Sequence, residues 1–579
     1  MNVLVYSGPE VLQSSLSRSL SSLRSVLYPH YTIQAVTLQS LLLRPWTTSC
    51  ALLVFPACRE QLVLPSSVAS AIKSFVEGGG SFLGLRAAAR IGGALSSVDP
   101  ADYSFRFQDR ASGSNIYLDL PPGGEDQSRR TSIKSPDGVI VDGVLETTTF
   151  SFGGLDQTKN TYAILGRRAD SDEVVAASFR ADAGNVAAWT VHVEAPVHPQ
   201  IGPNSEEQRK DLLRNTLRAL GLKLPTPDEE GPSHPLPQLL TAAPTRPDAV
   251  DKILNSLGVR PPTMFEDSHD IFMFHAAPEG EDRVASSRIQ TTSPDDDTRH
   301  IIAYRNGALP SKELTPLFDL ASYFSTLVTS RSDAGLDPTS EGHGFGEVLL
   351  YGEVVTSTQT LLDKNLRLLP HIPSPFLSLA THQIAGRGRG GNSWVSPVGC
   401  LQFSLRLRVP LSHFPAARLV FVQYLFALAV TEACRDEGVL GSWGDRVRIK
   451  WPNDVYVMGA GGTDRVTKVA GILVYTAFDG DAVDIIIGCG LNVASPPPIA
   501  SLASVIPSWE DRTLSMERTM AILMAKFEVM WDKFLENKGS FEPFMDLYLD
   551  RWLHTYAAVS RISFAHTTVD CSTHPGTSL

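Results

Sequence analysis

The chain has 579 residues, of which 43% are hydrophobic and 19% charged, and its formal net charge is −12. This length predicts several domains of ordinary globular composition, and the acidic balance argues against nucleic-acid binding by the whole protein. The six cysteines show no CxxC pair and no zinc spacing, and the start MNVLVYSGPE has no basic region before an apolar run. With no stretch near the roughly 20 apolar residues that span a bilayer, we expect a cytoplasmic protein without a secretory leader or a membrane partner.

Residues 1–222 alternate short apolar runs with helical stretches. NVLVYSG, ALLVFPA and SFLGL predict buried strands, whereas SLSRSLSSLRSVL and SSVASAIKSFVEGGG carry apolar residues at helical spacing, the second with a glycine stop. Such alternation predicts a doubly wound, mostly parallel sheet.

Two stretches of this first part resemble a known domain. GGGSFLGLRAAA sets a strand after a glycine cluster and continues into Arg86, and VHVEAP holds His192 and Glu194. The part resembles the class I glutamine amidotransferase-like domain at the front of fungal biotin ligases, a family that has a nucleophilic cysteine on a sharp turn after this strand. The resemblance places Arg86, His192 and Glu194 at the triad positions. Because a guanidinium stays protonated and offers no lone pair, and because Cys58 in the altered segment PACRE is not at the turn, we expect an inactive relative.

The next segments carry less information. Residues 223–248 are rich in proline and acidic side chains, and they predict a linker that buries no core. Residues 249–345 contain a strand or two around an acidic run and one short amphipathic helix, FDLASYFSTL, and their fold is not predicted. GHGFG at 342–346 lacks the following helix that a nucleotide loop needs.

GRGRGGNSW, at residues 386–394, combines four glycines with Arg387 and Arg389. Glycines permit close backbone approach to a ligand, and guanidinium groups suit carboxylate or phosphate oxygens. Alone, the stretch is equally typical of a flexible linker or an RGG-like RNA-binding tail. It lies, however, between the apolar runs FLSLATHQIA and CLQFSLRLRV, and a loop held between two strands favours a ligand clamp.

Further motifs surround this loop. LLYGEVV predicts a strand that leads into a helix capped by Ser357 or Thr358, and residues 418–437 predict a buried helix that is apolar nearly all round. VRIKWPNDVYV places Lys450 at a strand end, where its charge can neutralise a developing anion. KVAGILVYT and DIIIGCGLNV predict two more strands.

GRGRGGNSWVSPVGC, KWPNDVY, KVAGILV and GCGLNV, with STQTLL before them, occur in the order typical of one family. Residues 346–555 resemble the catalytic domain of biotin–protein ligases, which implies a class II synthetase-like mixed sheet, and hence an α/β and α+β multidomain chain. The resemblance implies that biotin and MgATP give biotinyl-5′-adenylate and pyrophosphate. The biotinyl group then moves to a lysine on the biotin carrier domain of a carboxylase, of the acetyl-CoA carboxylase or pyruvate carboxylase type.

The resemblance also implies roles for single residues. The predicted catalytic residues are Lys450, Arg387 and Arg389. The predicted biotin-binding residues are Ser357, Thr358, Gln359, Gln383, Arg387, Gly388, Arg389 and Lys450. The predicted residues on the ATP and adenylate side are Gly386, Gly390, Gly391, Trp394, Asn453, Asp454, Gly471 and Asn492. The residues that hold a metal are not predicted.

Two other functions remain open from the sequence. Lipoate-type ligases share the fold and the adenylation chemistry, and a non-catalytic regulatory scaffold could be built on an inactive front domain. A repressor role lacks support, since no basic helix-turn-helix is present. After YLDRWLHT the family continues into a small β-barrel, whereas residues 556–579 are too short and polar to form one; we expect a disordered or aberrant tail and no cap.

Overall fold

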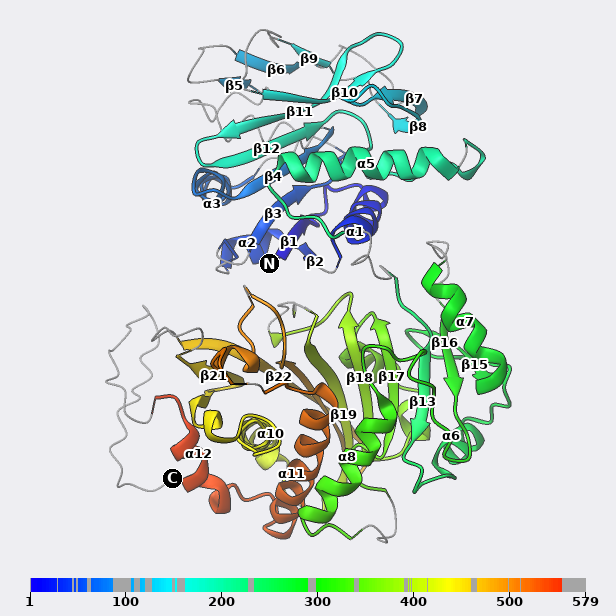
Figure 1. The fold of residues 1–579 in the computed structure, drawn as a ribbon, viewed down its shortest axis with the longest axis vertical. Helices are drawn as coiled ribbons and strands as arrows, with labels where there is room; N and C mark the ends of the chain where they lie inside the picture. Colours follow the sequence, from blue (N-terminus) through cyan, green and yellow to red (C-terminus); the bar gives the residue numbers. More distant parts are fainter. Residues whose placement is uncertain are drawn as a thin grey trace.

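The computed structural model describes residues 2–554 except 29, 44–45, 48–49, 60–63, 87–105, 109–114, 120–127, 148–150, 154–161, 202, 227–233, 290–297, 338–342, 390–393, 395, 397, 414, 460–465, 498 and 511. The described chain forms two bodies, each built on one large mixed sheet (Figure 1). The expected tail, 556–579, lies outside the described residues.

The amino-terminal body holds a nine-stranded sheet in the order β2-β1-β3-β4-β12-β11-β10-β7-β8. Its parallel strands are β1 (Asn2–Tyr6), β2 (Thr32–Val36), β3 (Cys50–Phe55), β4 (Ser81–Leu85) and β12 (Gly184–Trp189). Its antiparallel strands are β7 (Arg129–Lys134), β8 (Ile140–Glu146), β10 (Tyr162–Arg168) and β11 (Val174–Ala181). A small separate sheet contains β5 (Arg106–Gln108), β6 (Asn115–Asp119) and β9 (Ser151–Gly153).

The helices of this body pack in two groups. α1 (Gln13–Leu27) contacts α5 (Pro203–Ala219), and α2 (Leu38–Leu43) contacts α3 (Ser66–Glu77). Strands β1, β3 and β4 are almost entirely buried, as expected when helices cover both faces of a parallel sheet. The three predicted strands and two predicted helices are therefore confirmed, whereas the antiparallel extension was not predicted.

The carboxy-terminal body holds an eleven-stranded sheet in the order β14-β15-β16-β13-β17-β18-β19-β23-β22-β21-β20. The first strands of this sheet in the chain are β13 (Gln238–Ala242), β14 (Thr263–Glu266), β15 (Ile271–Ala276) and β16 (Thr298–Ala303). The later ones are β17 (Val348–Val355), β18 (Phe376–Gln383), β19 (Cys400–Pro410), β20 (Val447–Lys450), β21 (Asp454–Met458), β22 (Val466–Asp479) and β23 (Ala482–Asn492). Its α-helices are α6 (Ala249–Leu257), α7 (Ala277–Ile289), α8 (Leu320–Asp333), α9 (Thr358–Lys364), α10 (Val420–Cys434), α11 (Met516–Glu536) and α12 (Met545–Arg551).

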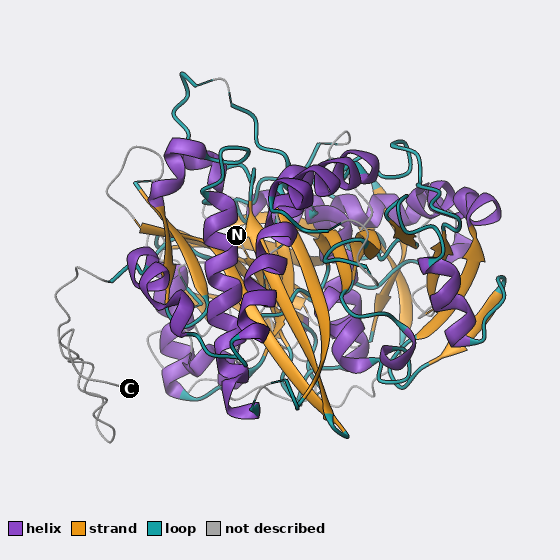
Figure 2. Cartoon of the chain, turned by 90° about the horizontal axis from the view of Figure 1, so that it is seen from below, coloured by secondary structure: helices purple, strands orange, loops and turns teal. Residues whose placement is uncertain are grey.

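The central strands of this sheet are buried on both faces because their side chains alternate between two cores. In β17, Leu349 and Tyr351 join the core that contains residues of α8, α10 and α11, whereas Val348 and Leu350 join a smaller core with residues of α6 and α9. Figure 2 shows the long strands from below, with helices packed against them.

The predicted all-apolar helix is confirmed as α10, which contacts α11 and strands β20 to β22. Together with the preceding turn, as Ala416–Cys434, it is long and apolar enough to cross a membrane, by length and composition alone. From Leu425 to Cys434 nearly every residue is buried, which accounts for the apolar sequence there, whereas Val420 in the first turn is exposed.

The prediction of a linker over residues 223–248 is wrong at Gln238–Ala242. This segment is the strand β13, whose five residues are buried and which pairs with β17 on one side and β16 on the other. The surrounding prolines and acidic residues obscured a short apolar run, QLLTA, that is stable only as the inner strand of a sheet. Residues 249–345 are consequently not a separate connecting region, because β14, β15 and β16 continue the same sheet.

Candidate active site

The floor of the cavity that the predicted motifs surround is a strip of the eleven-stranded sheet with little side-chain bulk. Gln402 of β19, Gly490 of β23 and Gly471 of β22 are aligned in register, and beside them lies the row Ser404, Gly488 and Leu473. Alternate residues of β23, such as Ile487 and Leu491, belong to the core with α10 and α11, so the two glycines face away from that core. A cavity of about 220 Å³ lies over this strip.

One end of the cavity is polar and uncharged. The start of α9 brings Thr358 and Gln359 to it, with Ser357 as the N-cap that accepts a hydrogen bond from the Thr360 amide, as predicted. The Thr358 amide donates to Gln383 Oε1 at 2.8 Å, and the Ser404 hydroxyl donates to Gln359 Oε1 at 3.0 Å. These buried amides and hydroxyls form an end suited to a ligand group that both donates and accepts hydrogen bonds.

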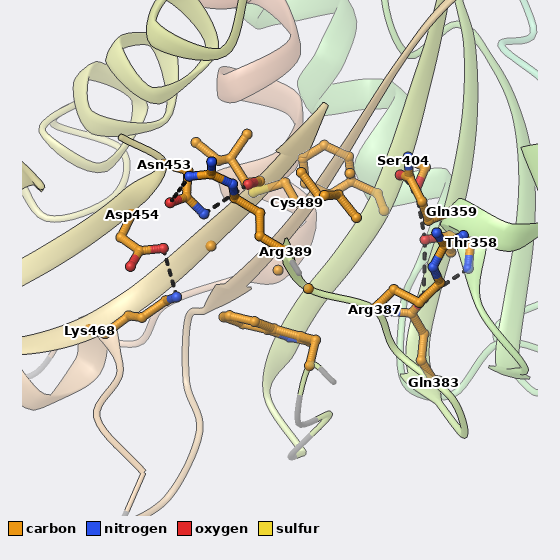
Figure 3. A pocket seen from close by; sticks show the side chains of 18 residues that line it. Thr358, Gln359, Gln383, Arg387, Arg389, Ser404, Asn453, Asp454, Lys468 and Cys489 are labelled. Carbon is orange, nitrogen blue, oxygen red and sulfur yellow. Dashed lines mark hydrogen bonds and ion pairs between the residues drawn. The ribbon is translucent and has the colours of Figure 1, made fainter. Parts of the chain in front are cut away.

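The other end is charged (Figure 3). Lys468 Nζ lies 2.6 Å from Asp454 Oδ1, and Arg389 Nη1 donates to Asn453 Oδ1 at 3.0 Å. Two cationic side chains and one carboxylate around one space favour a negatively charged ligand group.

Trp394 forms a wall at this end because glycines make room for it. A Cβ added at Gly490 would overlap the indole ring, and one added at Gly471 would lie 2.8 Å from its Cζ3. Lys468 Nζ lies 5.6 Å from the ring centroid, within range of a cation–π interaction. The glycines of KVAGILV and GCGLNV, Gly471 and Gly490, therefore make room for a tryptophan that lies 77 and 96 residues earlier in the chain.

The two arginines of the glycine loop point to different ends of the cavity (Figure 3). Arg387 Nη1 forms an ion pair with the buried Asp363 of α9 at 2.6 Å, whereas Arg389 extends toward Asn453. Arg387 is thus held against the helix at the uncharged end, and Arg389 is the one placed to meet an anion.

Most of the predicted site residues line this cavity. Those that do are Thr358, Gln359, Gln383, Arg387, Gly388, Arg389, Trp394, Asn453, Asp454 and Gly471. Those that the structure describes outside the lining are Ser357, Gly386, Lys450 and Asn492. Gly390 and Gly391 lie outside the described residues. Within the described part of the chain, no group of three or more His, Cys, Asp or Glu side chains is placed to hold a metal ion.

The positions of Lys450 and Lys468 relative to the cavity differ from those expected. The Lys450 ammonium lies 4.7 Å from the ring centroid of Tyr456, outside the cavity lining; its catalytic role stays a prediction. Lys468, which was not predicted, lines the cavity. The motif KVAGILV contains this lysine three residues before the predicted Gly471.

The amino-terminal body contains a second buried polar cluster. His192 Nδ1 lies 2.8 Å from Glu194 Oε1, which also accepts a hydrogen bond from the Ser15 hydroxyl at 2.6 Å. Although burial by itself would raise the pKa of Glu194, the hydrogen bonds from His192 and Ser15 and the charge of His192 hold it below its usual value. His192 and Glu194 are therefore a fixed pair in the core, which fits the structural role expected for them.

Arg86 follows β4 with a φ of 53°, in the left-handed region that non-glycine residues rarely adopt. β4 pairs in parallel with β12, and Leu85 lies opposite Trp189. The turn at Arg86 and the segment leading to His192 therefore both follow the carboxyl ends of these neighbouring strands. Cys58 is buried, and burial raises the pKa of its thiol to about 12, with a further contribution from Glu10. A thiol in this state is a poor nucleophile.

Comparisons with known proteins identify the family of this chain. The family described as Biotin/lipoate A/B protein ligase matches residues 351–492, and the one described as Biotin-protein ligase, N terminal, matches residues 1–98. The chain is 29% identical to a biotin–protein ligase of Schizosaccharomyces pombe, over 97% of this chain and 92% of that protein. It is 26% identical to a biotin–protein ligase of Homo sapiens, over 96% of this chain and 70% of that protein.

A third relative has higher identity over a shorter region. The biotin–[acetyl-CoA-carboxylase] ligase of Paracoccus denitrificans is 33% identical over 193 residues, which cover 32% of this chain and 74% of that protein. These matches confirm the family predicted from the motifs, whereas the likeness of the front body to an amidotransferase stays a prediction. The chain belongs to the biotin–protein ligase family, whose members are ligase enzymes.

Proposed function

We propose that this cavity binds biotin and ATP, joins them as biotinyl-5′-adenylate, and transfers the biotinyl group to a lysine of a carboxylase's carrier domain. The observation that carries the proposal is the chemical difference between the two ends of the cavity. Thr358, Gln359 and Ser404 offer both donors and acceptors to the ureido group of biotin. Lys468 and Arg389 face the end where the biotin carboxylate meets the α-phosphate of ATP.

The chemistry needs positioning and charge neutralisation rather than a protein nucleophile. A carboxylate oxygen of biotin attacks the α-phosphorus, the bond to the β-phosphate oxygen breaks, and pyrophosphate leaves with its electron pair. The cations at the charged end reduce repulsion between the two anionic reactants. In the second step the amine of the carrier lysine attacks the acyl carbon, and AMP leaves. Mg²⁺ enters as part of the MgATP substrate.

Lipoate is the main competing substrate, because the matching family includes lipoate ligases. Lipoate has no ureido group, so it would leave the buried side chains of Gln359 and Ser404 without ligand partners, which weakens binding strongly in a site built for hydrogen bonds. Calorimetric titrations with biotin and with lipoate separate the two assignments. Binding of lipoate as tight as that of biotin would refute the substrate assignment.

The direct test uses the full chain with biotin, MgATP and a carrier domain from an acetyl-CoA or pyruvate carboxylase. We expect release of pyrophosphate and one biotinylated lysine on the carrier, detected by mass spectrometry. A non-catalytic scaffold predicts neither product, so absence of both would favour that alternative.

Arg389→Gly should let the activated intermediate escape. Arg389 lines the charged end, and its guanidinium donates a hydrogen bond to the side chain of Asn453, so its remaining N–H groups are placed to hold the adenylate phosphate. We expect faster release of biotinyl-5′-adenylate and labelling of lysines on an added bystander protein. Asn453→Ala, which removes the partner but keeps the cation, should show a smaller effect. Labelling confined to the carrier by the Arg389 variant would exclude this role.

We further propose that the amino-terminal body is an inactive amidotransferase relative that binds or regulates rather than hydrolyses. The support is the guanidinium of Arg86 at the turn after β4, together with the buried, protonated thiol of Cys58. The full chain should release no ammonia from glutamine above the rate in buffer, measured with a coupled dehydrogenase. Release that Cys58→Ser abolishes would mean that the nucleophile is Cys58 after all.

A further inference from the structure

The two bodies touch beside the uncharged end of the cavity. Their close contact leaves a void of only about 10 Å³. The residues around it are Arg24, Tyr28, Tyr31, Thr32 and Ile33 from the end of α1 and the start of β2, and His382, Gln383 and Ile384 from the end of β18. Gln383 also lines the cavity, so this interface borders the site itself.

The central contact joins two rings. The rings of Tyr28 and His382 lie 4.3 Å apart between centroids and meet edge to face at 65°, a favourable arrangement for aromatic pairs. Burial is the main cause that lowers the pKa of His382 to about 4; the hydrogen bond to Ser396 opposes this shift, and the nearby charge of Arg24 adds to it. The imidazole facing Tyr28 is thus neutral at physiological pH.

His382 connects this contact to the cavity wall. Its Nδ1 lies 3.0 Å from the carbonyl oxygen of Ser396, two residues after Trp394. Because a carbonyl only accepts, Nδ1 carries the proton and donates. The Ser396 hydroxyl donates to Gln402 Oε1, which also accepts from Gln383 Nε2 at 2.8 Å. Ser396 is therefore held by His382 and by Gln402, and Gln402 is in turn bound to Gln383 of the cavity lining.

The opposite side of the loop is held separately. The amides of Ile384 and Ala385 donate to the carbonyls of Val355 and Thr356, each at 2.8 Å, and the Trp394 amide donates to the Gly386 carbonyl at 2.9 Å. The chain entering the loop is thus fixed by β17. The chain leaving it is bound to Gly386 through the Trp394 amide, and two residues further on it is held by His382 and Gln402 at Ser396.

We propose that Tyr28 of the amino-terminal body positions His382, and through Ser396 sets the place of Trp394 in the cavity wall. Tyr28 and His382 are positioning residues, since neither touches the reacting atoms. The front body then contributes to retention of the adenylate without any chemistry of its own. The inference rests on the proposed function only for its kinetic readout.

Four variants separate the ring contact from the hydrogen bond. Tyr28→Phe keeps the ring, and Tyr28→Ala removes it. His382→Asn places an amide nitrogen near the position of Nδ1 and keeps a donor to Ser396, whereas His382→Phe keeps a ring against Tyr28 and loses the donor. We expect biotinyl-5′-adenylate to leave the full-length enzyme about five- to tenfold faster in Tyr28→Ala and His382→Phe. Tyr28→Phe should stay within about twofold of wild type, and His382→Asn should fall between.

Hydrogen–deuterium exchange provides a readout that needs no catalysis. Tyr28→Ala, a change in the amino-terminal body, should speed exchange at the Trp394 amide, and Tyr28→Phe should not. His382→Phe, a change in the carboxy-terminal body, should reproduce the effect and covers the case in which Tyr28→Ala fails to fold. Unchanged exchange at Trp394 in both Tyr28→Ala and His382→Phe would overturn the proposal, as would equal effects of Tyr28→Ala and Tyr28→Phe. If wild type makes no adenylate, the proposed function fails, and the exchange comparison still decides this inference.

Discussion

Lys468→Ala should lower the rate of pyrophosphate release from biotin and MgATP by at least about 100-fold. The Lys468 ammonium is fixed at the charged end of the cavity by Asp454 and the face of Trp394, so it stabilises developing negative charge without first reorganising. Removal of one such preorganised donor typically costs about 2.7–4 kcal/mol in the transition state, which corresponds to roughly 10²- to 10³-fold in rate. The variant also leaves the Asp454 carboxylate without its cation near the phosphates, which adds repulsion.

Lys450→Ala is the matched comparison for this experiment. Both residues are lysines near the same end of the sheet, but the Lys450 ammonium lies against Tyr456, outside the cavity lining. We expect the larger loss in Lys468→Ala when pyrophosphate release is measured for both variants under saturating substrates. An equal or larger loss in Lys450→Ala would show that Lys450 reaches the phosphates in the complex, as the sequence motif predicted.

Gly490→Ala should weaken binding of biotinyl-5′-adenylate by about ten- to a hundredfold. The added methyl group would overlap the indole of Trp394, and overpacking of this kind typically costs about 1–3 kcal/mol because a rigid ring has to move. Displacement of Trp394 removes the wall of the charged end. Affinity is measured by calorimetry with a non-hydrolysable adenylate analogue.

A double-mutant cycle identifies the cause. Trp394→Ala removes the wall directly, so Gly490→Ala added to it should cause little further loss, and the two effects should be strongly non-additive. Additive losses would mean that Gly490 contacts the ligand through its own backbone and that the tryptophan is not what requires the glycine.

The order of the motifs and the residues of the uncharged end could be predicted from the sequence. Thr358, Gln359 and Gln383 were predicted there, and all three line the cavity. Whether Lys450 or Lys468 lines the cavity could not be predicted from the sequence. Strand periodicity tells which residues share a face within one strand, but which face meets a cavity depends on pairing between strands. Here the pairing of β21 with β22 shifts by a bulge between Val455 and Tyr456, a feature that neither strand shows alone.

The packing of Trp394 illustrates the same limit. Gly471 was expected on the nucleotide side, whereas in the structure both Gly471 and Gly490 have a tryptophan from a distant loop as neighbour. A glycine in a sequence can indicate that a side chain would not fit at that position, but it does not indicate which neighbouring group occupies the space. Likewise QLLTA lies in a proline-rich, acidic segment, and its place as β13 follows only from the existence of β17, about 110 residues later in the chain.

The pairing of β13 with β17 has a practical consequence for how this enzyme can be divided. All eight residues of β17 are buried, and one of its two backbone edges is covered by a strand that precedes residue 249. A fragment that began at residue 346, where the family motifs begin, would present that edge to solvent as a long apolar template for other chains, and such edges promote aggregation. In the full chain the outer strand on this side of the sheet is β14, which has four residues and lies next to Pro261 and Pro262. So short a strand exposes few backbone N–H and C=O groups with which a second molecule could pair.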